Sequence, residues 1–189
     1  MKLTRYLVLV SLLTGISLVV QAKENSMKIR TFKVERIEVD AKKSFEELTA
    51  AFEKKILAAD FPTFNKLIAS HVAAGEIEAK VQSMVGDLGF MILGKIDQGP
   101  LVSLLGKPKK MTTYLIGNPV LANRMFEQHP GVGLYAPLRG SIYEDYEGKS
   151  HFTYDRPSTV LEQFENSEIR AVAKMLDEKM ASLAAYLTQ

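Results

Sequence analysis

The side chains best suited to chemistry in this sequence lie on a predicted β-hairpin. Its strands cover 134–145 and 149–155, and the segment 146–148 fits a three-residue loop that ends in a left-handed glycine. That loop length predicts these cross-strand pairs: Asp145 with Lys149, Tyr143 with His151, Ser141 with Thr153, and Arg139 with Asp155. The same register gathers these residues on the opposite face: Leu138, Gly140, Ile142, Phe152 and Tyr154. The turn chemistry and the hydrophobic pattern therefore agree.

The polar face of this hairpin could bind or convert a small molecule. Arg139 could hold a carboxylate or phosphate through two parallel hydrogen bonds. His151 beside Tyr143 is the one pair that suits acid–base chemistry near neutral pH. The alternative is structural, because Arg139 and Asp155 at facing positions could form a cross-strand ion pair. We predict Arg139, Tyr143, His151 and Asp155 as ligand-binding residues and assign no catalytic residue.

Asn118 is the fifth predicted ligand-binding residue. It follows Gly117 at the end of a predicted strand, and Pro119 behind it suits the first position of a helix. A helix that begins at the end of a strand offers free amides to an anion. Simple helix capping is the alternative. If this strand neighbours the hairpin, Asn118 and Arg139 could converge on one anionic group.

Other motifs for chemistry are missing from the sequence. There is no cysteine, so no disulfide or thiolate metal site can form. The three histidines, His71, His129 and His151, lie far apart and lack metal-ligand spacing. Phosphate loops, dinucleotide fingerprints and nucleophile elbows are also missing. We therefore predict no metal and no cofactor.

The N-terminus has the three-part pattern of an export signal. Lys2 and Arg5 precede an apolar run over 6–20, and Ala22 ends a segment typical of signal cleavage. The run is shorter than the roughly 20 residues that span a bilayer, which favours cleavage over an uncut anchor. We predict a signal peptide over 1–22, a single domain over 23–189, and a periplasmic protein without a stable membrane span.

The charge of the predicted mature chain argues against nucleic acid as a partner. Of 24 Lys and Arg, two lie in the signal segment, which leaves 22 basic against 22 acidic residues. Nucleic-acid binding favours clustered excess Lys and Arg. The one basic cluster, 107–110, is interpreted as a solvated turn.

The remaining patterns predict an α+β fold of two layers, with helices packed on a mixed sheet of about five strands. Three strands are expected besides the hairpin pair: 31–39, 90–96 and 111–116. Helices are expected from Ser44, from Pro62, over 76–85, over 119–128 and over 167–187. The last is a long amphipathic helix with an apolar stripe that suits a core. Gly75 is expected to end the second helix, and Ser167 to cap the last.

The chain also resembles a known family. The motifs Tyr114-Leu115-Ile116-Gly117-Asn118-Pro119, Tyr135-Ala136-Pro137-Leu138-Arg139 and Tyr143-Glu144-Asp145 with Gly148 resemble the family called domain of unknown function 302. The likeness covers about 30–160. It implies an α+β fold and a homodimer, and it implies no established activity or catalytic residue. The stretch 61–85 and the long last helix distinguish this chain from the family's short form.

These observations favour an exported, non-catalytic module that binds a small organic anion or a protein partner. The first alternative is a hydrolase or isomerase that uses His151 and Tyr143, with Arg139 as an anion clamp. The second alternative is a structural or assembly protein. A pocket that brings the three side chains together would favour catalysis.

Overall fold

The computed structural model describes residues 27–107 and 109–189. Residues Thr31–Gln189 form one compact unit, and the features below lie within it. The predicted signal peptide lies outside the described residues. Within the part of the chain that the structure describes, none of the helices has the length and hydropathy of a transmembrane span.

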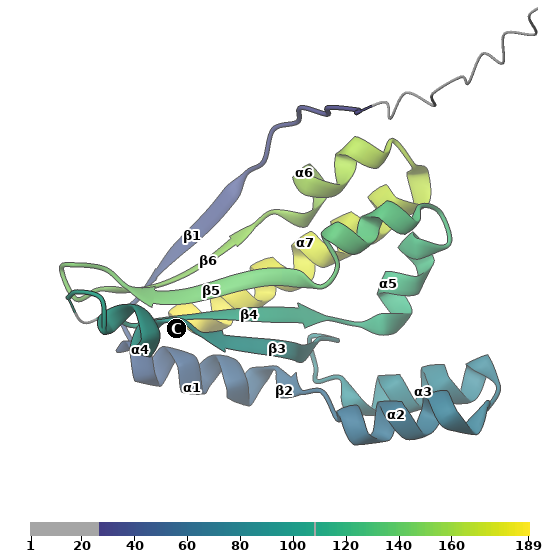
Figure 1. The fold of residues 1–189 in the computed structure, drawn as a ribbon, viewed down its shortest axis with the longest axis horizontal. Coiled ribbons are helices and arrows are strands. Elements are labelled where there is room, and N and C mark those ends of the chain that lie inside the picture. Colours follow the sequence, from purple (N-terminus) through teal and green to yellow (C-terminus); the bar gives the residue numbers. More distant parts are fainter. Residues whose placement is uncertain (1–26, 108) are drawn as a thin grey trace, which may run out of the picture. The chain divides into compact units, whose positions relative to one another are not determined.

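The fold is built on a six-stranded mixed sheet in the order β1-β6-β5-β4-β3-β2 (Figure 1). The strands are β1 (Arg36–Ala41), β2 (Leu57–Ala58), β3 (Met91–Asp97), β4 (Met111–Gly117), β5 (Leu138–Glu144) and β6 (Ser150–Asp155). All neighbours pair antiparallel except β2 and β3, which are parallel. The short β2 is the strand that the sequence did not indicate.

Helices pack on one face of this sheet, which confirms the α+β prediction. The α-helices of the described residues are α1 (Phe45–Lys55), α2 (Phe61–Ser70), α3 (Ala74–Met84), α4 (Gly99–Ser103), α5 (Pro119–Phe126), α6 (Pro157–Leu161) and α7 (Ser167–Thr188). Two short 3₁₀ helices, η1 (Pro130–Leu134) and η2 (Glu162–Phe164), complete the described elements. Helices α1 and α7 contact each other and the sheet, and α7 runs along it (Figure 1).

The hairpin forms with the predicted register. Tyr143 faces His151 and Ser141 faces Thr153 in the β5–β6 pair. Gly148 takes a φ of +81°, the left-handed conformation that this loop requires. Because side chains alternate along a strand, the register places Ile142 and Phe152 in the core.

The core lies between the sheet and the helices α1 and α7. Phe52 of α1 stacks on Tyr114 of β4, with ring centroids 4.3 Å apart, and both side chains are fully buried. The predicted stripe of α7 is buried as expected: Ile169, Val172, Leu176, Met180, Leu183 and Leu187. Full burial of one such side chain contributes about 1.5–3 kcal/mol. This layer therefore fixes the position of the hairpin.

Local signals set several helix ends, although not all as predicted. The capping box of α1 is present, with Ser44 accepting from the Glu47 amide and Glu47 accepting from the Ser44 amide. Helix α7 is capped by Asn166, not by Ser167. Gly75 lies inside α3, and α2 ends instead at His71, which takes a left-handed conformation. In both cases a residue earlier in the chain than the predicted one forms the cap: Asn166, one residue before Ser167, and His71, four residues before Gly75.

The first strand and one loop also differ from the prediction. β1 begins at Arg36, not at 31, because its ladder with β6 ends at the pair Arg36–Asp155, and Pro157, which has no backbone N–H to donate, follows soon after. The connection from β3 to β4, for which no helix was expected, begins with the short helix α4.

Candidate functional site

The polar face of the hairpin is opposite the helices, as the register predicts. Arg139, Ser141 and Tyr143 of β5 share this face with His151, Thr153 and Asp155 of β6. Arg139 and Asp155 border the same two cavities, so their side chains lie on the same side of the sheet. The geometric basis of the predicted site is therefore present.

The predicted ion pair between Arg139 and Asp155 is wrong. Asp155 instead pairs with Arg36 of β1, whose Nη2 lies 2.9 Å from Asp155 Oδ1 and whose Nε donates to the same oxygen at 2.9 Å. The reason is the edge strand β1, which places Arg36 directly opposite Asp155. Arg139 is exposed, and among the described residues it has no hydrogen bond or ion pair through its side chain.

Two cavities meet at Arg139. The Arg139 cavity has a volume of about 430 Å³. Its mostly apolar walls come from β4, β5, η1, α6 and the segment between η1 and β5: Leu115, Gly133, Leu134, Tyr135, Pro137, Leu138, Pro157, Val160 and Leu161, with Arg139 and Asp155. The polar cleft has a volume of about 230 Å³, and Thr113, Ser141 and Thr153 line it beside Arg36, Arg139 and Asp155. Arg139 therefore borders both an apolar space and a hydroxyl-lined one.

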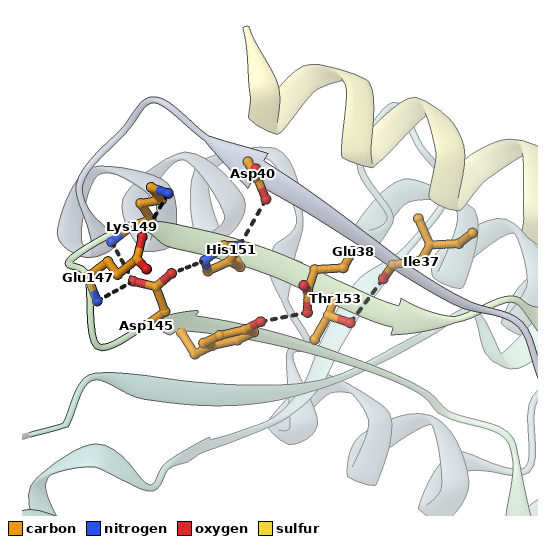
Figure 2. Close-up of polar contacts among 9 residues, drawn as sticks. Ile37, Glu38, Asp40, Asp145, Glu147, Lys149, His151 and Thr153 are labelled. Atoms are coloured by element: carbon orange, nitrogen blue, oxygen red, sulfur yellow. Dashed lines mark hydrogen bonds and ion pairs between the residues drawn. The ribbon is translucent and has the colours of Figure 1, made fainter.

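His151 and Tyr143 are close together but engaged in other contacts. Their rings stack at a centroid distance of 4.9 Å. Both nitrogens of His151 contact carboxylates, Nδ1 with Asp40 Oδ1 and Nε2 with Asp145 Oδ2, each at 3.0 Å (Figure 2). The Tyr143 hydroxyl donates to Glu38 Oε2 at 2.5 Å. Neither residue lines the Arg139 cavity or the polar cleft.

The surroundings of this pair raise the pKa of both side chains. Burial alone would lower the pKa of His151, but hydrogen bonds to Asp145 and Asp40 outweigh it and raise that pKa above 6.5. Burial, and then the hydrogen bond to Glu38, raises the pKa of Tyr143 to about 12. His151 thus links edge strand β1 to the hairpin turn through hydrogen bonds to two carboxylates. A general base needs a free nitrogen near its substrate, and these contacts occupy both.

Asn118 is a helix cap and does not join Arg139. Its side-chain oxygen accepts from the amides of Val120 at 2.9 Å and Leu121 at 3.4 Å. Its amide nitrogen donates to the Gly89 carbonyl at 3.0 Å, and the residue is 8% exposed. Asn118 borders a third cavity under α5, which Arg139 does not line. The structure therefore does not bring these two predicted residues together.

Sequence reasoning missed the acidic side chains that surround His151. Asp40 and Glu38 alternate along β1, and this alternation is visible in the sequence as a polar face. It does not reveal which strand lies beside β1. Among the described residues, no group of three or more acidic or histidine side chains is arranged to hold a metal ion.

These features define the chain as an α+β protein whose mixed sheet has helices on one face and a charged, partly hollowed opposite face. The family model described as "Domain of unknown function DUF302" matches residues 65–187, and the chain belongs to this family. The match extends through α7 and includes most of α2 and all of α3. The family model therefore covers these helices, and its match ends later than the expected likeness over about 30–160.

A solved structure shows the same fold. The crystal structure of an uncharacterized conserved protein of this family from Bacillus stearothermophilus is similar, with a TM-score of 0.57 and 14% sequence identity. The likeness covers 80% of this chain and 96% of that chain. No curated protein matches the sequence.

Proposed function

We propose that this protein is an exported, non-catalytic module that binds a small organic anion. The anionic group would contact Arg139, and the apolar body of the ligand would occupy the Arg139 cavity. The observation that carries this proposal is an arginine without a partner among the described residues, at the junction of an apolar cavity and a polar cleft. Export rests on the N-terminal pattern of the sequence.

The charges at this junction favour an anion. Asp155 is the acidic residue nearest in register, and Arg36 already neutralises it at 2.9 Å. The positive charge of Arg139 is therefore left uncompensated. A guanidinium binds a carboxylate or phosphate through two parallel hydrogen bonds, which fix orientation as well as charge. The ligand would in this way complete an ion pair that the protein leaves open.

The size and lining of the Arg139 cavity suit a small molecule. Ligand pockets have volumes of about 300–1,000 Å³ and combine apolar walls with few polar groups. The volume of about 430 Å³ falls in this range, and the walls from Leu115, Tyr135 and Leu161 are apolar or aromatic. The hydroxyls of the polar cleft lie beside the same arginine and suit polar groups next to the anion.

The contacts of His151 support a binding role over an enzymatic one. An enzyme of the predicted kind would need His151 or Tyr143 to reach a ligand held by Arg139. Both side chains instead make hydrogen bonds to Asp40, Asp145 and Glu38. The stacked pair supports the sheet beside the cavity and does not line it.

The first test is native mass spectrometry of the protein purified from its own host. We expect a retained small anion on the wild type and on Arg170→Ala, which removes another exposed arginine without a partner among the described residues. Arg139→Ala should lose the anion, and Arg139→Lys should retain less of it because lysine cannot bind in the two-pronged manner. Equal retention by Arg139→Ala and wild type, with both folded, would rule out this site.

The second candidate is contact with a protein, most simply a second copy of the chain. Four apolar side chains around α4 support it: Ile96 is 50% exposed, Leu101 69%, Leu104 82% and Leu105 87%. Exposed apolar clusters of this kind often mark interfaces. A homodimer that covers them should become monomeric in Leu104→Ser/Leu105→Ser, measured by light scattering after size-exclusion chromatography. A wild-type monomer at all concentrations would contradict this candidate.

A further inference from the structure

The α5 cavity is a second apolar space beside the proposed anion site. Its volume is about 200 Å³, and its walls include Leu93, Leu121, Met125, Phe126 and Leu176. Its one side-chain amide, Asn118, already makes hydrogen bonds to Val120, Leu121 and Gly89. The lining therefore offers a ligand hydrocarbon contacts and little else.

The α5 cavity and the Arg139 cavity have two walls in common. Pro137 and Leu138, at the start of β5, line both. Arg139 follows them and lines both the Arg139 cavity and the polar cleft. Three consecutive residues therefore border three adjoining spaces: a polar cleft, an apolar cavity with Arg139 and the Arg36-paired Asp155 at its rim, and a second apolar cavity.

This order of polarity matches an amphipathic molecule with its charge at one end. We infer that the three spaces form one binding track for a straight-chain alkyl monocarboxylate. The carboxylate binds Arg139, the first part of the chain fills the Arg139 cavity, and the rest passes Leu138 into the α5 cavity. This inference rests on the proposed function and adds a ligand class to it.

Chain length is the property that tests the track. Each methylene that leaves water contributes about 0.8 kcal/mol, which is about a fourfold gain in affinity. We expect affinity to rise from hexanoate through octanoate to decanoate by about this factor for each added methylene. An alcohol of the same length as decanoate lacks the anion and should bind much more weakly. Isothermal titration calorimetry below the micelle concentrations measures each affinity.

Ala122 offers a way to close the far end of the track. It lines the α5 cavity from α5 and is partly exposed, so a larger side chain there fills space without entering the core. Ala122→Phe should leave hexanoate binding unchanged and remove the advantage of decanoate. Ala122→Ser, which changes the volume little, should keep the wild-type length preference. Ala122→Leu serves as a smaller filler if circular dichroism shows that the Phe variant is unfolded.

The outcomes separate this inference from the proposed function. If hexanoate binds and Arg139→Ala abolishes its binding, but decanoate binds no better, the track is refuted and the anion site stands. The track is also refuted if folded Ala122→Phe and Ala122→Leu keep the wild-type length preference. If no alkyl carboxylate binds, or if Arg139→Ala binds them all as well as wild type does, the carboxylate site and the track both fail.

Discussion

The His151 linkage leads to a quantitative prediction about stability and pH. His151→Gln removes a side chain that is 9% exposed and that holds β1 and the hairpin turn together. Its two hydrogen bonds go to carboxylates that reach solvent, Asp40 at 80% and Asp145 at 29% exposure, so we assign them about 1 kcal/mol together. Stacking on Tyr143 adds about 0.5–1 kcal/mol. The variant should lose about 2 kcal/mol of unfolding free energy.

The pH dependence of this loss has a definite sign. The pKa of His151 is raised in the folded state above its ordinary 6.5, so the charged imidazole stabilises the fold fully below pH 6.5. That contribution disappears as the pH rises through the folded-state pKa. The pKa of Asp145 is lowered by hydrogen bonds from the Lys149 backbone and from His151, so its contribution is lost only in acid. The wild type should therefore exceed His151→Gln in unfolding free energy by the largest amount between about pH 5 and 6.5.

Urea denaturation of both proteins at several pH values measures the difference. His71→Asn is the matched control, because His71 is exposed at the end of α2 and asparagine tolerates its left-handed conformation. The control should follow the wild type at every pH. A stabilising role of charged His151 is refuted if the difference in unfolding free energy between wild type and His151→Gln stays constant or widens from pH 6 to about 9.

Two further predictions concern stability. Asn118→Ala should lower the free energy of unfolding by about 1–2 kcal/mol, because it removes the cap of α5 and leaves the buried Gly89 carbonyl without its donor. Thermal unfolding measures this loss, and an unchanged stability would contradict the capping role of Asn118. Gly140→Ala should cost about 1–3 kcal/mol, since a methyl group there would lie 2.9 Å from Cε2 of the fully buried Phe152. Gly106→Ala is its control, because nothing lies within 4 Å of the added carbon, and equal effects of the two would refute the packing argument.

Local signals allowed much of the fold to be predicted. The capping box at Ser44 and the loop ending in Gly148 act over a few residues, so their chemistry alone determines the start of α1 and the hairpin register. The stripe of α7 was equally readable because burial repeats every three or four residues. These elements depend little on the rest of the chain.

The candidate site was less predictable because it depends on a strand distant in sequence. Arg36 lies 119 residues from Asp155, and no local pattern indicates that β1 would pair with β6. That pairing takes Asp155 away from Arg139, and it brings Asp40 to His151. The Arg139 cavity has the same origin, since α6 and η1 meet β5 only in the folded chain. The sequence indicated which side chains share the polar face, but their partners depend on tertiary structure.

The two borders of the sheet limit how it can associate. An edge strand with unpaired backbone groups invites another strand to extend the sheet, and charged side chains or a short length prevent this. One border, β1, carries Arg36, Glu38 and Asp40 on its open face, and the other, β2, has two residues. A strand added at β1 would need to accommodate those charges, and a strand added at β2 could pair with only two residues. This architecture therefore favours association through side-chain contacts away from both edge strands.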